Sequence, residues 1–436
     1  MTAAHDLIVV GAGPAGSTAA LCAARAGLRV LLLERGETAG AKNMYGGALY
    51  GSPLDALIPD WTSRAPLERH ITRRVTMFMT PDGSVSLDFR SRAFAPPTPN
   101  GYTVLRPLFD AWLADEAVRA GAQLATSTLV AGLLQREGRV VGVRIAGTDE
   151  AIEAPLVIAA DGVNSFLAKE AGLVGKYRPE AFEVGAKQVI RLGRAVLEER
   201  FGLTGDEGAD IEMIGSGIGD IIGGAFLYTN RDSVALGIVA EIGALSESRT
   251  RPFDLIENLK RHPAIEPLIR GGTQVEYSAH MVSAGGWDGI SRLHAPGLMV
   301  TGDAAGLMLG VGLYFEGVNY AIGSGAAAAE TAAEAIRAGD VGDRMLSGYR
   351  RRMERGFVLR DLKAFRRATP LIHRRRFQVA YPALVQGIVE DVYRVDNSRP
   401  KRKVAAIVRR RLRQQHVSLR GLVRDGLDAL RAFVFE

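Results

Sequence analysis

Cysteine is almost absent from this chain of 436 residues, and its scarcity restricts the chemistry that the protein can perform alone. The single cysteine, Cys22, has no second thiol with which to form an internal disulfide. One thiol also cannot hold an iron–sulfur cluster, which takes about four thiolates. Any step that uses an iron–sulfur cluster therefore needs another subunit.

Several other signals are missing. No apolar run approaches the ~20 residues that span a bilayer, and the start, MTAAHDLIVVGAG, lacks the basic and then apolar order of a secretory signal. The seven histidines show no HxxxH or HExxH spacing, and no GxSxG elbow occurs. We therefore expect a cytoplasmic protein with no metal site of its own.

Charge is unevenly distributed along the chain. Residues 344–431 contain 24 Lys and Arg against 7 Asp and Glu, a net of +17, while the remainder has a net of −11. Such a basic region can meet an acidic protein or anionic lipid, and equally it can be a set of solvated helix faces. Nucleic acid is not expected, because no aromatic platform or DNA-binding pattern accompanies the charge.

The order of apolar segments predicts an α/β protein. A strand at 6–10, a Gly-rich turn, a helix to Arg25 and a strand at 28–34 form a βαβ unit. A hairpin is expected at 73–79 and 84–89, and an amphipathic helix at 107–120. Residues 180–285 alternate short strands with Gly turns, which suits a mainly antiparallel sheet with one helix near 252–261.

The expected organisation is therefore a Rossmann-like nucleotide-binding domain with an inserted, mainly antiparallel sheet and a helical, basic C-terminal region. The nucleotide-binding domain is expected at 1–180, with 70–105 contributing to the substrate side, and it resumes at 286–340. The substrate domain is expected at 181–285, and the basic helices at 341–436.

The segment GAGPAG, residues 11–16, fills the GxGxxG template between a strand and a helix. Gly11 allows the tight turn, Gly13 lets the backbone approach a pyrophosphate, and Gly16 lets the helix pack on the strand. The helix N-terminus offers free N–H groups to phosphates. Glu34 ends the next strand, where its carboxylate can accept hydrogen bonds from a ribose, so the sequence predicts a dinucleotide site.

Two later segments indicate which dinucleotide is bound. VIAADGVNS places Asp161 and Gly162 at a strand end, and VTGDAAG does the same for Gly302 and Asp303. Each pair alone is more typical of a turn. In the order GxGxxG, DG, GD they resemble the FAD-binding set of the para-hydroxybenzoate-hydroxylase-like superfamily, over residues 6 to about 338.

This resemblance assigns further residues. Arg106, in YTVLRPLF, matches an arginine near the ribityl and phosphate part of the flavin. In GVNYA the backbone N–H groups of 317–319 are expected to face the flavin pyrimidine edge, where they stabilise negative charge on the reduced ring. The complete expected cofactor-binding set is Gly11, Gly13, Pro14, Ala15, Gly16, Glu34, Arg35, Lys42, Gly46, Gly47, Arg106, Asp161, Gly162, Gly302, Asp303, Gly317, Val318 and Asn319.

One loop distinguishes among the flavoenzymes of this superfamily. GAKNMYGGALY, from residue 40, resembles the KNxxGG segment of the FixC family, which is related to electron-transfer flavoprotein (ETF)–quinone oxidoreductase. GGAFLYTNRDSVALGIV at 223–239, HPAIEPLIRGG at 262–272 and EYSAHMV at 276–282 agree with it. The resemblance implies that electrons arrive from ETF, rest on FAD and leave to quinone or to a ferredoxin-like partner.

Four side chains are candidates for work beside the flavin. Lys42 supplies a cation that favours an anionic reduced flavin, and Asn43 both donates and accepts hydrogen bonds. Tyr277 and His280 lie on an expected strand, where they either face a flavin or quinone pocket or satisfy each other. A lysine in a solvated Gly-rich turn is the alternative for Lys42.

The chain departs from single-chain ETF–quinone oxidoreductases, because it has no four-cysteine segment near its C-terminus. A separate ferredoxin-like subunit would suit the basic region. In residues 399–415 the spacing brings Val404, Ile407, Val408 and Leu412 close to one helix face, as in a peripheral membrane helix on the inner face of the membrane. Two other functions remain open: a geranylgeranyl-reductase-like or hydroxylase-like flavoenzyme acting on an apolar molecule, and a flavin-holding docking subunit.

Overall fold

The computed structural model describes residues 4–42, 47–96, 99–175, 178–219, 221–311, 314–395, 397–398 and 400–434. Its first layer is a six-stranded sheet, and the strands that carry the Gly-rich motifs lie at its centre. In spatial order the strands are β17 (His294–Ala295), β18 (Leu298–Val300), β11 (Leu156–Ala159), β1 (Leu7–Val10), β2 (Val30–Leu33) and β7 (Gln123–Ala125). All neighbours are parallel except β17 and β18. The four residues of each of β1, β2 and β11 are all buried, which explains their continuous apolar runs.

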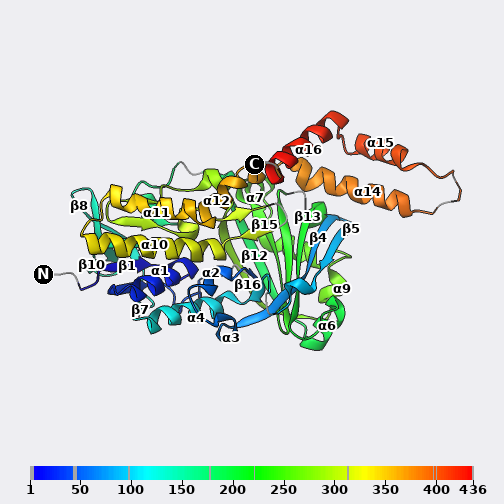
Figure 1. The fold of residues 1–436 in the computed structure, drawn as a ribbon. Coiled ribbons are helices and arrows are strands. Elements are labelled where there is room, and N and C mark those ends of the chain that lie inside the picture. Colours follow the sequence, from blue (N-terminus) through cyan, green and yellow to red (C-terminus); the bar gives the residue numbers. More distant parts are fainter. Residues whose placement is uncertain are drawn as a thin grey trace.

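Helices α1 (Pro14–Arg25), α4 (Arg106–Arg119), α10 (Val318–Ala338) and α11 (Asp343–Arg355) accompany this sheet, and Figure 1 shows α1, α10 and α11 stacked beside one another. The Ala-rich composition of α1 and α10 allows very close packing. A Cβ on Gly325 of α10 would lie 2.3 Å from the carbonyl oxygen of Ala15. Since Ala15 belongs to the turn that begins α1, this contact fixes the position of the helix N-terminus.

The second layer is a nine-stranded sheet that is antiparallel except for the neighbours β4 and β13. Its order is β16 (Thr273–Ser283), β12 (Phe182–Arg191), β15 (Ser233–Glu241), β14 (Gly223–Thr229), β13 (Glu207–Gly215), β4 (Leu67–Thr80), β6 (Tyr102–Val104) and β3 (Ala48–Leu49), with β5 (Gly83–Arg90) paired to β4. The β4–β5 hairpin has the predicted position. The expected fold class is confirmed.

Smaller elements complete the body. A three-stranded sheet contains β10 (Ala151–Glu153), β9 (Arg139–Ile145) and β8 (Val130–Arg136), and β19 (Leu309–Gly310) pairs with β20 (Phe315–Glu316). The short helices are α2 (Ser52–Asp55), α3 (Trp61–Arg64), α5 (Phe166–Glu170), α6 (Arg194–Phe201), α7 (Ile242–Ser248), α8 (Pro252–Lys260) and α9 (Glu266–Ile269). Only α8 was expected between 180 and 285; the structure adds α6, α7 and α9.

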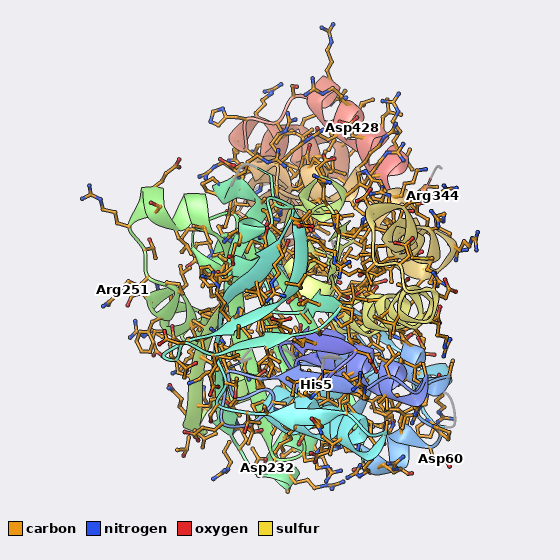
Figure 2. The ribbon with its side chains drawn as sticks, turned by 90° about the vertical axis from the view of Figure 1, so that its left-hand side faces the viewer. His5, Asp60, Asp232, Arg251, Arg344 and Asp428 are labelled. Carbon is orange, nitrogen blue, oxygen red and sulfur yellow. The ribbon has the colours of Figure 1, made fainter. Side chains whose placement is uncertain are left out.

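The C-terminal region is helical, as predicted, and comprises α12 (Phe357–Ala364), α13 (Ala368–Ile372), α14 (Tyr381–Tyr393), α15 (Val404–Gln414) and α16 (Leu419–Phe433). In Figure 1, α14 to α16 project from the body as an arm, and α16 returns toward the nine-stranded sheet. Buried Asp425 of α16 lies 3.1 Å from Arg374 and 2.9 Å from Arg376, so ion pairs fasten the arm. In Figure 2, Asp428 of α16 lies at the opposite end of the molecule from Asp60 and Asp232.

The arm corrects one expectation. Ile407 and Leu412 of α15 are buried, and Leu412 and Val408 pack in a small apolar cluster with residues of α14 and α16, so this helix turns its apolar face toward the other C-terminal helices. Only Val404 of the four is exposed, at 57%. Helix α15 is therefore not the membrane-facing helix that its spacing indicated. Within the described residues, no helix combines the length and hydropathy that a membrane crossing requires.

Candidate functional site

A cavity opens where the carboxyl ends of β1, β11 and β18 meet the edge of the nine-stranded sheet. Parallel strands bring their following loops to one edge of a sheet, which is where ligands bind in such folds. The expected residues that line the cavity are Gly11, Gly13, Pro14, Ala15, Glu34, Arg35, Lys42, Gly47, Arg106, Asp161, Gly162, His280, Asp303, Gly317, Val318 and Asn319. Asn43 and Gly46 lie outside the described residues.

The three glycines of GAGPAG have three different surroundings. Gly11 has φ +99°, and a Cβ there would lie 2.3 Å from the carbonyl oxygen of Ala160. A Cβ on Gly16 would lie 1.8 Å from the carbonyl oxygen of Gly11, so Gly16 allows the helix to approach the strand. Gly13 is the N-cap of α1 and has no atom within 4 Å of its ideal Cβ position. Open space at an uncapped helix N-terminus is what a pyrophosphate needs.

Glu34 occupies the end of β2 with little exposure. Its Oε2 accepts a hydrogen bond from the N–H of Ala12 (2.9 Å), and its Oε1 accepts one from the N–H of Gly36 (2.7 Å). Two backbone donors thus hold the carboxylate at the cavity wall while oxygen lone pairs remain for ribose hydroxyls. Arg35 beside it is exposed and lines the same cavity.

A charged group occupies the centre of the cavity wall. Buried Arg106 forms a bidentate pair with Asp110, with N–O distances of 2.8 and 2.9 Å. Burial disfavours the guanidinium, but the carboxylates of Asp110 and Asp303 outweigh burial and raise the pKa of Arg106. The Asp303 side chain is exposed to the open cavity, but the protein that encloses it raises its pKa, against the opposing charges of Arg106 and His280. The site therefore places a permanent cation beside a carboxyl that faces the cavity.

The Asp161 carboxyl is anchored within its own loop. Its Oδ1 accepts from the Ser165 hydroxyl (2.8 Å), and its Oδ2 accepts from the N–H of Leu167 (3.3 Å), while burial raises its pKa. Gly162, with φ +79°, supplies the turn that follows. Gly302, with φ +64°, turns the chain ahead of Asp303 but does not itself line the cavity.

Helix α10 begins at the cavity with no side-chain cap at Gly317, so its first N–H groups are available to a ligand. The amide nitrogen of Asn319 donates to Glu316, and the Asn319 Oδ1 atom is buried without a hydrogen-bond partner among the described residues. A buried acceptor that lines a cavity indicates a missing donor. The Asn319 acceptor, which is unpaired among the described residues, and the open space at Gly13 together fit a dinucleotide whose ring carries N–H groups.

Five described residues of the GAKNMYGGALY loop line the cavity: Gly40, Lys42, Gly47, Ala48 and Tyr50. Lys42 is exposed and lines the cavity. A Cβ on Gly47 would lie 1.8 Å from a ring carbon of Tyr228, so this glycine allows close approach to a tyrosine of β14. The sequence led us to expect that the backbone at Gly47 approaches the cofactor ring. The structure shows that Gly47 also lies against the ring of Tyr228, a residue that the sequence did not indicate.

His280 and Tyr277 are separated. His280 lines the cavity, and its Nδ1–H donates to the carbonyl oxygen of Met281 (2.6 Å). Tyr277 is 39% exposed, packs edge-on against Phe253 of α8 and does not line the cavity. Residues three apart on a strand point to opposite faces, so the two cannot satisfy each other. The structure does not bring Tyr277 to the site.

A second, apolar cavity of about 410 Å³ adjoins the first, and Tyr228 and Phe315 line both. Its other walls come from β4, β13, β14, α13, the helical segment Arg376–Ala380 and the end of α16, including Phe78, Met213, Phe226, Ile372, Phe377 and Phe433. Glu183, Glu212 and His373 also line it. Sequence reasoning missed these residues, although Asp210 and Glu212 alternate within the apolar strand ADIEMI and so share one face.

Comparison with known families and proteins agrees with this geometry. Residues 6–183 match the FAD dependent oxidoreductase family, residues 206–282 the ubiquinone-binding domain of ETF-QO, and residues 368–434 the ETF-QO/FixC family C-terminal domain. The chain is 40% identical to Protein FixC of Escherichia coli K12 over 425 residues, covering 98% of each. It is 41% identical to the probable electron transfer flavoprotein-quinone oxidoreductase YdiS of the same organism, over 427 residues and 98% of each.

Two solved structures show the same fold. A geranylgeranyl bacteriochlorophyll reductase-like protein of Thermoplasma acidophilum aligns with TM-score 0.73 and 22% identity, covering 98% of this chain and all of its own. The myxobacterial FAD-dependent halogenase CndH aligns with TM-score 0.64 and 22% identity, covering 84% and 83%. The full-length identities, with a cavity that fits FAD, show that the chain is an FAD-dependent oxidoreductase and belongs to the FixC/ETF–quinone oxidoreductase family.

Proposed function

We propose that this protein accepts electrons from an electron-transfer flavoprotein onto FAD and passes them to a quinone. One observation carries the proposal: an apolar cavity shares Tyr228 and Phe315 with the FAD cavity. A quinone ring in the apolar cavity would be one side chain away from the flavin. The cavity walls come largely from the segments that match the ubiquinone-binding and C-terminal family domains.

The residues of the first cavity divide the work of holding FAD. The N-terminus of α1 would bind the pyrophosphate, Glu34 the adenosine ribose, and Asp303 hydroxyls of the flavin side. When bound, FAD takes up an electron pair and releases electrons singly or as a pair. The N-terminus of α10 would stabilise negative charge on the reduced ring, because its N–H groups are uncapped.

Lys42, Asn43 and His280 are proposed to tune the flavin and not to react. Lys42 places a cation at the cavity mouth, and His280 lies near Asp303. A positive charge favours the anionic reduced flavin. Changing Lys42 to Met should therefore retain FAD while lowering the flavin potential, and an unchanged potential would remove this role. Tyr277 is not proposed, because it faces away from the cavity.

The C-terminal arm is proposed to meet partners. Helix α16 exposes an apolar stripe of Leu419, Val423, Leu427 and Leu430, at 67, 57, 49 and 41%. The stripe runs toward Phe433, which lines the apolar cavity. Exposed Arg420, Arg424 and Arg431 lie on the same helix. An apolar stripe with basic neighbours suits an anionic membrane surface, from which a quinone could enter. The remaining basic surface would suit an acidic ferredoxin-like subunit.

Vesicle flotation tests the membrane proposal. Wild-type protein should float with vesicles that contain anionic lipid and less with neutral ones. A double change of Val423 and Leu427 to Glu should abolish flotation while leaving FAD content unchanged. Changing Arg251, which is exposed on the body away from the arm, to Glu is the control for altered charge. Equal flotation of the stripe variant would exclude α16 as the contact.

Anaerobic mixing tests the electron donor. The FAD-loaded protein should be reduced rapidly by reduced ETF and only slowly by NADPH. Rapid reduction by NADPH with no reduction by ETF would instead favour a reductase or hydroxylase acting on an apolar molecule. Retention of FAD with no reduction by either donor would favour a docking subunit.

A further inference from the structure

Quinone reduction needs protons as well as electrons, and the apolar cavity contains few polar groups. Among the described lining residues, the ionisable groups other than tyrosines are Glu183, Glu212 and His373. Glu212 comes from β13, and its Oε1 accepts a hydrogen bond from the Tyr228 hydroxyl (3.1 Å). Since Tyr228 lines both cavities, the carboxyl lies at the junction where an acceptor would meet the flavin.

A charge imbalance surrounds Glu212. Asp210 lies two residues earlier on the same face of β13, is 1% exposed, and its carboxylate disfavours a negative charge on Glu212. One guanidinium serves both carboxyls: Arg74 of β4 lies directly opposite Asp210, with an N–O distance of 2.8 Å. Two acids and one cation in a low-dielectric site cannot all remain charged without cost. One carboxyl therefore keeps its proton.

The geometry assigns the proton to Glu212. Asp210 has the direct ion pair with Arg74, whereas Glu212 lines the apolar cavity and, among the residues that the structure describes, accepts from the neutral phenol of Tyr228. Arg74 is also held by Tyr50, to whose oxygen it donates (2.7 Å), and by the ring of Tyr314 beneath it (4.6 Å). Burial, and then the Asp210 carboxylate, raise the pKa of Glu212 well above its ordinary value. The neutral acid at this position is a proton donor.

A second donor lies on another wall of the same cavity. The Nε2 atom of His373, at the end of α13, lies 3.4 Å from Oε1 of Glu183 on β12. Glu183 is 2% exposed, and its Oε2 accepts no hydrogen bond from the described residues. Burial disfavours the imidazolium, but Glu183 and Glu241 outweigh burial and raise the pKa of His373. Two proton donors of different chemistry thus face one apolar space.

We propose that Glu212 and His373 are the catalytic acids that protonate the two oxygens of a quinone bound in the apolar cavity. The inference rests on the proposed function, which supplies the electrons. The two quinone C=O groups gain an electron pair from reduced flavin and become C–O groups of the quinol. One oxygen takes its proton from the Glu212 carboxyl and the other from the His373 imidazolium. Asp210 and Arg74 position Glu212, and solvent protons refill both acids.

Single-turnover oxidation tests this assignment, because acceptors differ in their need for protons. Protein with chemically reduced FAD is mixed anaerobically with a soluble quinone analogue, or with ferricenium, which takes one electron and no proton. Glu212→Gln keeps the size and the acceptor for Tyr228, so ferricenium should oxidise its flavin within twofold of the wild-type rate. Loss of a general acid should slow oxidation by quinone about 100-fold.

Three further measurements complete the test. His373→Gln should give the same selective loss, and Glu199→Gln, at an exposed carboxyl of α6, should change neither rate. Wild-type protein should show the infrared carbonyl band of a neutral carboxylic acid at pH 7, and the difference spectrum of wild type minus E212Q should contain the band of one such acid. Quinone-analogue affinity should stay within twofold in both cavity variants.

The outcomes separate this inference from the function on which it depends. Oxidation of E212Q and H373Q by quinone at the wild-type rate would overturn the inference while leaving the function intact. If wild-type flavin is oxidised by ferricenium but not by quinone, the proposed function itself fails. Should E212Q not fold, the infrared band of the wild type decides, since its absence at pH 7 would overturn the role of Glu212.

Discussion

Changing Gly13 to Ala should separate cofactor binding from folding. Gly13 is the N-cap of α1 with φ −72° and ψ −179°, a conformation that alanine adopts freely, and an added Cβ meets no atom within 4 Å. The apoprotein should therefore lose only about 0.5 kcal/mol, the order expected for replacing a glycine N-cap by alanine. The methyl group instead enters the space that the pyrophosphate would occupy.

The effect on FAD affinity follows from the hydrogen bonds at the helix N-terminus. Displacing a phosphate from one N–H group loses a hydrogen bond to a charged partner, worth about 1.5–3 kcal/mol, or roughly 10- to 150-fold in Kd. At FAD equal to 100 times the wild-type Kd, wild-type protein gains about 2.7 kcal/mol of stability. A variant that binds 100-fold more weakly gains only about 0.4 kcal/mol.

Thermal unfolding with and without FAD measures both quantities. Gly325→Ala is the matched control, because its Cβ would lie 2.3 Å from the Ala15 carbonyl and force α1 and α10 apart. Overpacking of this kind costs about 1–3 kcal/mol, so this variant should unfold earlier even without FAD. A Gly13→Ala protein with full FAD stabilisation, or with an apoprotein as unstable as Gly325→Ala, would refute the placement of the pyrophosphate.

Three other predictions concern the rest of the chain. Arg69 is 1% exposed and donates to the carbonyl oxygens of residues 205, 207, 230 and 231. Arg69→Lys should therefore lower the free energy of unfolding in urea by about 3–5 kcal/mol. A loss of less than about 1 kcal/mol would contradict this prediction. Burial raises the pKa of Cys22 to about 11, which leaves less thiolate at pH 8. Iodoacetamide at pH 8 should therefore alkylate the folded protein about 100-fold more slowly than the unfolded chain. Equal alkylation rates would contradict the burial of Cys22. Hydrogen bonds from Arg411 lower the pKa of Asp391 to about 2, so the α14–α15 contact should be complete above about pH 4 and lost toward pH 2. Asp391→Asn should lose the α14–α15 contact already at neutral pH, and limited proteolysis should then cleave the arm. An arm that stays intact in this variant would show that the contact does not hold the arm in place.

Most of the residues that line the first cavity could be predicted from the sequence because their constraints are local. Gly11, Gly13 and Gly16 all serve one turn, and the strand–turn–helix pattern around them identifies it as the turn of a dinucleotide-binding βαβ unit. Asp161 and Asp303 follow apolar runs that can only be central strands, and parallel strands then bring both carboxyls to one edge. Family resemblance supplied Arg106, whose pairing with Asp110 one helical turn later was readable as an i, i+4 pair.

The apolar cavity could not be predicted in the same way. Arg74 and Asp210 meet because β4 and β13 pair in parallel across a long stretch of intervening chain, and no local pattern encodes that register. Phe433 reaches the cavity only because the arm returns to the sheet. The separation of Tyr277 from His280, by contrast, followed from strand alternation and was available from the sequence.

Helix α15 illustrates the limit of amphipathic patterns. Its apolar face indicates burial but does not say whether protein or lipid covers it. In the structure Ile407 and Leu412 are covered by neighbouring helices, while the apolar stripe of α16 stays exposed. Only tertiary contacts distinguish the two helices.

The central claim is that electrons pass from ETF through FAD to a quinone at the adjoining apolar cavity. Its most direct test is the flavin spectrum of a single anaerobic sample of wild-type protein, followed in time. Reduced ETF should bleach the flavin absorbance, and a quinone analogue added next should restore it with one quinol formed per flavin. A flavin that stays oxidised with ETF, or stays reduced with the quinone, would contradict the account.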